Sequence, residues 1–171
     1  VEDCDLRVAD CRITDRREDL RPEPGEELID LQGATVLPGN VNAHMHLYTA
    51  LTAGAPSPPR PLSSYKELLS ELFWALDKSL DRDAVYLSAL AGAWDAVRSG
   101  TTLIFDLHSS LSFIRGSLDL VEQGVRQIGL RACLSYEITD RGGKGLRDTT
   151  IEETERYVDK IRNEMMRDRD K

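Results

Sequence analysis

The spacing of apolar residues after position 40 predicts strands and helices in alternation. Residues 41–46 have the length and pattern of a strand. Apolar residues then recur at helical spacing over 64–76 and 81–100, and each range begins with a residue that can cap a helix. The runs 101–108 and 130–136 are rich in apolar and β-branched residues without a clear alternation, which is typical of strands buried on both faces. The face of the second helix that we expect to point inward comprises Leu87, Leu90, Ala91, Trp94 and Val97.

The alternation continues through the rest of the chain. Residues 112–129 predict a helix, and a last helix over 150–165 is expected to be capped by Thr150 and Glu153. The glycine-rich segment 140–145 is expected to be a loop. Strands and helices that alternate in this way form a parallel sheet with helices on its outside, so the predicted fold class is α/β.

The first part of the chain has a different pattern. Short strand-like segments separated by prolines and glycines predict a small β-layer, and they are 5–9, 11–14, 27–31 and 34–37. We therefore expect one domain in residues 1–37 and the start of an α/β domain in residues 38–171. The charged helical tail has no closing element, which suggests a piece of a longer protein.

Composition narrows the classes of function. With 171 residues, 40% of them hydrophobic, the chain can bury a core. A net charge of −8 argues against a nucleic acid partner, because phosphate binding needs clustered Lys and Arg. We expect a cytoplasmic protein without a membrane partner, since no apolar stretch approaches the roughly 20 residues that span a bilayer and no signal segment opens the chain. The three cysteines are expected to be reduced thiols.

The most specific chemical signal is the pair His44 and His46. Side chains two residues apart lie on the same face of a strand, so both imidazoles are expected to point toward one site. Neutral imidazole is a good ligand for zinc or ferrous iron, and the pair therefore predicts two ligands of a divalent metal, with zinc preferred. A catalytic zinc takes about three protein ligands, so two histidines are half a site. The alternative is that they merely line one face of a strand.

Other candidates lie at the ends of the next two predicted strands. His108 closes the second strand, and Glu137 and Asp140 follow the third. The carboxyl ends of barrel strands carry the active site, so we expect these three residues to contact a polar substrate. The alternatives are a hydrogen-bonded histidine and two solvated carboxylates. Asp106 lies inside an apolar run, where a carboxylate needs a partner, and we expect a structural role for it.

The residues around the histidine pair also match a known motif. Residues 37–48 read Leu-Pro-Gly-Asn-Val-Asn-Ala-His-Met-His-Leu-Tyr and resemble the LPG-x-(V/I)-N-x-H-x-H segment of the amidohydrolase superfamily. Residues 99–108 and 129–141 resemble its cytosine deaminase and chlorohydrolase branch, and within that branch the SsnA-type aminohydrolases. Asn40 departs from the motif, because an apolar residue is usual there.

The resemblance implies a fold and an activity. It implies a metal-dependent TIM (β/α)₈ barrel, of which this chain holds about the first three strands, preceded by part of a β-sandwich-like composite domain. The metal role carries over to His44 and His46 alone, since the family's later ligands and its proton-transfer glutamate have no counterpart in this sequence. The implied reaction is hydrolytic deamination of an amino-substituted heterocycle, or cleavage of a related C–N bond, by a metal-activated water.

Two hypotheses of different classes stay open. The chain is either the N-terminal part of a metal-dependent aminohydrolase, inactive by itself, or a truncated barrel fragment that acts as a non-catalytic assembly or binding module. A nucleotide-binding domain is disfavoured because no glycine fingerprint follows a strand. The expected partner is a small-molecule substrate, and the resemblance admits a homodimer. The sequence identifies neither the substrate nor the residue that transfers protons.

Overall fold

The structure is a computed structural model that describes residues 4–56, 58 and 60–169. The chain divides into two compact units, Val1–Pro38 and Gly39–Lys171. That the first unit is part of a β-sandwich composite domain stays a prediction.

The described residues of the first unit contain one hairpin. Strands β1 (Asp5–Ala9) and β2 (Arg12–Arg17) pair antiparallel through a turn in which Asp10 and Cys11 have positive φ angles of 48° and 59°. Two central residues with positive φ match the twist of the flanking strands. The strands predicted at 27–31 and 34–37 are wrong, because these segments are irregular and pair with no neighbour in the described part of the chain.

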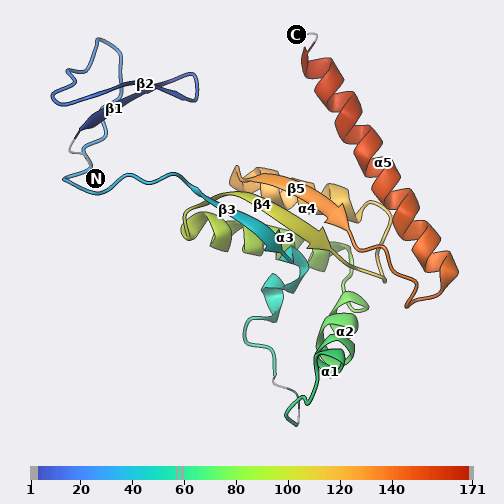
Figure 1. Ribbon diagram of the computed structural model, residues 1–171. Coiled ribbons are helices and arrows are strands. Elements are labelled where there is room, and N and C mark those ends of the chain that lie inside the picture. Colours follow the sequence, from blue (N-terminus) through green and yellow to red (C-terminus); the bar gives the residue numbers. More distant parts are fainter. Residues whose placement is uncertain (1–3, 57, 59, 170–171) are drawn as a thin grey trace. The chain divides into compact units, whose positions relative to one another are not determined.

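The second unit is built on a parallel sheet, as predicted. Strands β3 (Asn40–Met45), β4 (Thr101–His108) and β5 (Arg131–Tyr136) lie side by side in that order (Figure 1). The parallel sheet and the helices that alternate with its strands confirm the predicted α/β fold class. Parallel pairing places the carboxyl ends of all three strands at one edge, which is where such folds carry their sites.

The helical elements between and after these strands depart from prediction at their ends. They are η1 (Leu47–Thr52), α1 (Tyr65–Leu68), η2 (Leu69–Phe73), α2 (Trp74–Asp77), α3 (Arg82–Arg98), α4 (Ser117–Ile128) and α5 (Lys144–Arg169). The helix predicted over 64–76 is interrupted by the π-helical turn η2. The helix predicted from residue 112 begins at Ser117, and the Ser112 hydroxyl donates to the Leu80 carbonyl at 2.6 Å. Helix α5 begins at Lys144, so Thr150 lies inside it and part of the predicted loop is helical.

Helix α3 packs through its small residues, and the inward face predicted for it is wrong. Leu87 and Trp94 are 48% and 54% exposed, whereas Ala89 and Gly92 are buried. A Cβ atom at Gly92 would lie 2.7 Å from Leu47 Cδ2, so the buried face is too close to its neighbours for large side chains. Close packing of this kind selects small residues over the most apolar ones.

Strand β4 is buried on one face, and the prediction of two buried faces is wrong. Ile104, Asp106 and His108 are buried, whereas Phe105 between them is 42% exposed. Among the residues that the structure describes, the apolar core beside β4 is formed with helices α3 and α4. The buried face of β4 therefore includes two polar side chains, Asp106 and His108, near the carboxyl end of the strand.

Helix α5 is tied to the start of α4. The Glu153 carboxylate is buried and accepts the backbone N–H groups of Gly116 and Leu118 at 3.0 and 3.2 Å. Glu153 therefore caps α4 and not its own helix, which corrects the prediction. Although α5 has 26 residues, no helix in the described ranges is both long and apolar enough to cross a membrane.

Removal of this interhelical cap should destabilise the unit. Glu153→Ala leaves two N–H groups at the start of α4 without their acceptor and removes one of the two carboxylates that pair with Arg156, so we expect a loss of about 1–3 kcal/mol in the free energy of unfolding. Urea unfolding measures it. The control is Glu152→Ala, since Glu152 makes an exposed pair with Arg115 and should change stability by less than about 0.5 kcal/mol. Equal effects of the two substitutions would contradict this cap.

Candidate metal centre at the carboxyl edge of the sheet

The two histidines of the motif lie together. His44 is the penultimate residue of β3, and His46 directly follows the strand. Their ring centroids are 4.7 Å apart in an edge-to-face arrangement. The spacing in the sequence predicted this common placement. His44 is exposed, and its backbone N–H donates to Asn42 Oδ1 at 3.2 Å.

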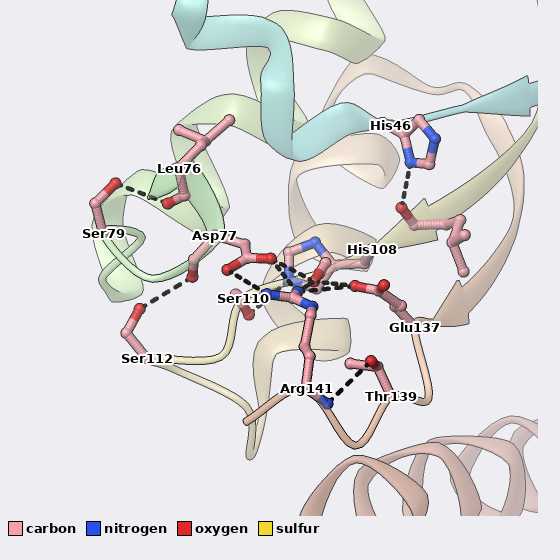
Figure 2. A network of polar contacts seen from close by, with 12 residues as sticks. His46, Leu76, Asp77, Ser79, His108, Ser110, Ser112, Glu137, Thr139 and Arg141 are labelled. Carbon is pink, nitrogen blue, oxygen red and sulfur yellow. Dashed lines mark hydrogen bonds and ion pairs between the residues drawn. The ribbon is translucent and has the colours of Figure 1, made fainter. Parts of the chain in front are cut away.

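The neighbouring strand holds the ring of His46. His46 Nδ1 lies 2.9 Å from the carbonyl oxygen of Leu107 in β4 (Figure 2). A carbonyl only accepts hydrogen bonds, so Nδ1 is the donor, and in a neutral imidazole Nε2 then has the lone pair. Histidines that bind metals usually donate their second ring N–H in this way, and the arrangement therefore fits two imidazole ligands of a divalent metal. Within the described ranges no three His, Cys, Asp or Glu residues come together as a complete ligand set.

Asp106 lies in β4 and pairs with Met45 at the end of β3. One of its oxygens, Oδ1, accepts the backbone N–H of Leu47 at 2.7 Å, and Oδ2 is buried with no partner among the described residues. Burial raises the pKa of Asp106 to about 7, although the bond from Leu47 acts in the opposite direction. The carboxylate that needed a partner thus has a single backbone donor.

His108 is fully buried. Its Nε2 lies 2.9 Å from Ser110 Oγ, and its ring packs edge-on against those of Tyr48 and Tyr136. Desolvation lowers the pKa of His108 to about 3, so the imidazole is neutral. These contacts match the alternative of a hydrogen-bonded histidine, and a substrate contact by His108 stays a prediction.

A single guanidinium joins the connections that follow the three strands. Arg141, after β5, donates from Nη1 to Asp77 Oδ1 at 3.2 Å, and a second bond from Nη2 reaches Asp77 Oδ2 (Figure 2). Asp77 lies at the end of α2, on the long connection after β3. Arg141 Nη2 also lies 3.1 Å from Ser109 Oγ, just after β4, and 3.0 Å from Glu137 Oε2. We name Asp77, Ser109, Glu137 and Arg141 the loop network.

The charges of the loop network are unequally buried. Asp77 is buried, and desolvation raises its pKa while the bonds from Arg141 and Ser109 oppose that change. Burial alone would lower the pKa of Arg141, but its bonds to the two carboxylates raise it. The Arg141 guanidinium also lies 5.4 Å from the ring centroid of Trp74. Only Glu137, whose side chain is 33% exposed, presents a carboxylate to solvent from this network.

The structure brings some of the predicted site residues together and adds others. Glu137 is held by the loop network, and its backbone N–H donates to the His108 carbonyl at 2.8 Å. Asp140 is exposed, and a role in substrate contact stays a prediction for both residues. Sequence reasoning missed three members, and they are Asp77, Ser109 and Arg141. Arg141 lies in an irregular loop and Asp77 at the end of a short helix, so no periodic pattern marked either of them.

The chain is similar to known deaminases over most of its length. It is 31% identical over 88% of its residues to a 5-methylthioadenosine/S-adenosylhomocysteine deaminase of Thermococcus sibiricus, and covers 32% of that protein. It is 30% identical over 88% of its residues to a 5'-deoxyadenosine deaminase of Methanothermobacter thermautotrophicus, and covers 33% of it. The chain thus spans about a third of the length of these relatives.

Solved structures show the same fold. A mutant atrazine chlorohydrolase of Arthrobacter aurescens TC1, complexed with zinc and atraton, superposes with a TM-score of 0.62 at 23% identity, over 79% of this chain and 31% of that one. A triazine hydrolase of the same genus gives a TM-score of 0.64 at 22% identity, over 80% and 31%. A sequence model of the amidohydrolase family matches residues 35–169. Since this match covers most of its length, the chain belongs to the amidohydrolase family.

Proposed function

We propose that the chain is part of a metal-dependent aminohydrolase and supplies two of its metal ligands, His44 and His46. The observation that carries the proposal is the bond between His46 Nδ1 and the Leu107 carbonyl, because it leaves Nε2 as the ring nitrogen that can bind a metal, and the ring centroid of His44 lies 4.7 Å away. The names of the deaminase relatives support hydrolysis of a C–N bond. The zinc in a structure of similar fold supports zinc over iron.

The residues of this chain would bind the metal and orient its ligands, and the metal would activate the attacking water. A bound divalent metal lowers the pKa of a coordinated water toward 7, which provides a nucleophile at neutral pH. The Leu107 carbonyl holds His46 in the tautomer that binds, and the loop network keeps the connections after the three strands together. Further ligands and the proton-transfer residue would come from outside this sequence.

We propose an amino-substituted heterocycle as the substrate, which the resemblance to the cytosine deaminase and chlorohydrolase branch implies. Glu137 offers a half-exposed carboxylate at the same edge of the sheet, suited to accept a hydrogen bond from a ring N–H or an amino group. Asp140 is a second, exposed candidate. His108 is buried, so we propose that it acts through Ser110 and Tyr136 and not by direct contact.

Zinc binding tests the proposal directly. We expect the 171-residue chain to bind one zinc ion weakly, in competition with a chromophoric chelator, and His44→Ala or His46→Ala to weaken binding at least about tenfold, because each removes one of two ligands. Glu152→Ala, which removes an exposed carboxylate of α5 that pairs with Arg115, is the control and should bind as the parent does. Unchanged binding in both histidine variants would rule out this site.

The inactivity of this chain by itself can be tested separately, and zinc binding distinguishes the two classes of function. Since the ligand set in this chain is incomplete, we expect no turnover of aminated heterocycles, such as deoxyadenosine derivatives, by the 171 residues alone, measured as release of ammonia. Zinc binding that depends on the two histidines favours the enzyme, whereas a non-catalytic module predicts none. Robust ammonia release by the chain alone would refute the view that it is inactive by itself.

Arg141 should matter for stability because it pairs with a buried carboxylate. Arg141→Met leaves Asp77 buried and unpaired, and we expect a loss of about 3–5 kcal/mol in the free energy of unfolding, measured with urea. The double variant Asp77→Asn with Arg141→Met removes the unpaired charge and should recover part of the loss. Arg147→Met is the control, since Arg147 pairs with a half-exposed Asp148. A double variant no more stable than Arg141→Met would contradict the ion pair as the cause.

A further inference from the structure

Strand β4 holds the His46 region at two successive residues. The Leu107 carbonyl accepts the ring N–H of His46, and the Asp106 carboxylate accepts the N–H of Leu47, the next residue of the chain. The ring of His46 and the backbone N–H that follows this residue are thus both bonded to β4. The distances are 2.9 and 2.7 Å.

The sheet ladder by itself leaves this stretch poorly defined. The register between β3 and β4 shifts between Asn42 and Met45, and Met45 pairs with Asp106. Irregular pairing of this kind disrupts the ladder and re-aims side chains. Element η1 begins at Leu47, and His46 provides no side-chain cap for it. The first N–H of η1 is satisfied instead by Asp106, from 59 residues further along the chain.

Burying the Asp106 carboxylate costs free energy, and in return it accepts, among the described residues, a single hydrogen bond, from the Leu47 N–H. Its carboxylate is buried, one oxygen has no partner in the described ranges, and no cation appears among the groups that bond it. An apolar side chain on this face, like the neighbouring Ile104, would avoid the cost of burying a carboxylate. What the carboxylate adds is an acceptor for the Leu47 N–H.

We propose that Asp106 is a positioning residue for His46: its bond to the Leu47 N–H sets the backbone direction at the end of β3, so that Nδ1 meets the Leu107 carbonyl and Nε2 is presented beside His44. The role of His46 as a metal ligand rests on the proposed function. The orientation and tautomer of the ring do not, and they can be measured without metal.

The test compares three variants by two readouts. Asp106→Leu removes the acceptor, Asp106→Asn keeps an oxygen that can accept the Leu47 N–H, and Glu153→Ala perturbs a buried carboxylate that caps α4 instead. Long-range ¹H–¹⁵N correlation spectra of the metal-free chain report which nitrogen of His46 carries the proton. Competition with a chromophoric chelator reports the zinc affinity.

We expect the parent chain and Asp106→Asn to show the Nδ1-protonated tautomer of His46 and equal zinc affinity. Asp106→Leu should give a mixture of tautomers and bind zinc about tenfold more weakly. Glu153→Ala should lower the unfolding midpoint and change neither readout. An unchanged tautomer and unchanged zinc affinity in a folded Asp106→Leu would overturn the proposal, because Asp106 would then be structural only.

Two further outcomes are also decisive. If Asp106→Leu does not fold, Asp106→Ser takes its place, since the shorter side chain cannot reach the Leu47 amide, and the same two readouts decide. If no form of the chain binds zinc but the His46 tautomer changes in Asp106→Leu, the positioning role stands and the proposed function fails. A tautomer that is unchanged while zinc binding depends on both histidines overturns the positioning role alone.

Discussion

The carboxyl end of β4 supports both sides of the candidate site. Its Leu107 carbonyl accepts the ring N–H of His46, which follows β3. Its His108 carbonyl accepts the backbone N–H of Glu137, which follows β5. Parallel strands make this possible, because their carboxyl ends meet at one edge and the end of the middle strand faces both neighbours. Displacement of β4 would therefore move the proposed metal ligand and the exposed carboxylate together.

Buried polar groups near this edge are satisfied in different ways, and the difference suggests different roles. Asp77 is paired with a guanidinium that also contacts the connections after β4 and β5. Asp106 has a single backbone donor, and His108 has a hydroxyl. The ion pair of Asp77 with Arg141 holds loops together. The Asp106 carboxylate, in contrast, accepts one backbone N–H and in our proposal orients it. This edge of the sheet thus combines the loop network with the hydrogen bond between Asp106 and the amide that follows His46.

The parts of the site that the sequence could predict are those governed by short-range geometry. His44 and His46 are two residues apart on a strand, and Glu137 directly follows one. Asp77 and Arg141 are 64 residues apart, and no periodicity connects the end of a short helix with a loop after β5. Asp106 was expected to need a partner, but that the partner is the amide after His46 follows from the pairing of β3 with β4.

The sequence by itself determined the order of strands and helices in the second unit, the common placement of the two histidines and membership of the amidohydrolase family, because these depend on local periodicity and on a contiguous motif. Only the tertiary structure decided which face of α3 is buried, since close approach at Gly92 favours small side chains over Leu87 and Trp94. It also decided that Glu153 caps α4 and that Arg141 joins three connections. Such choices depend on which segments become neighbours in space, and no local pattern records that.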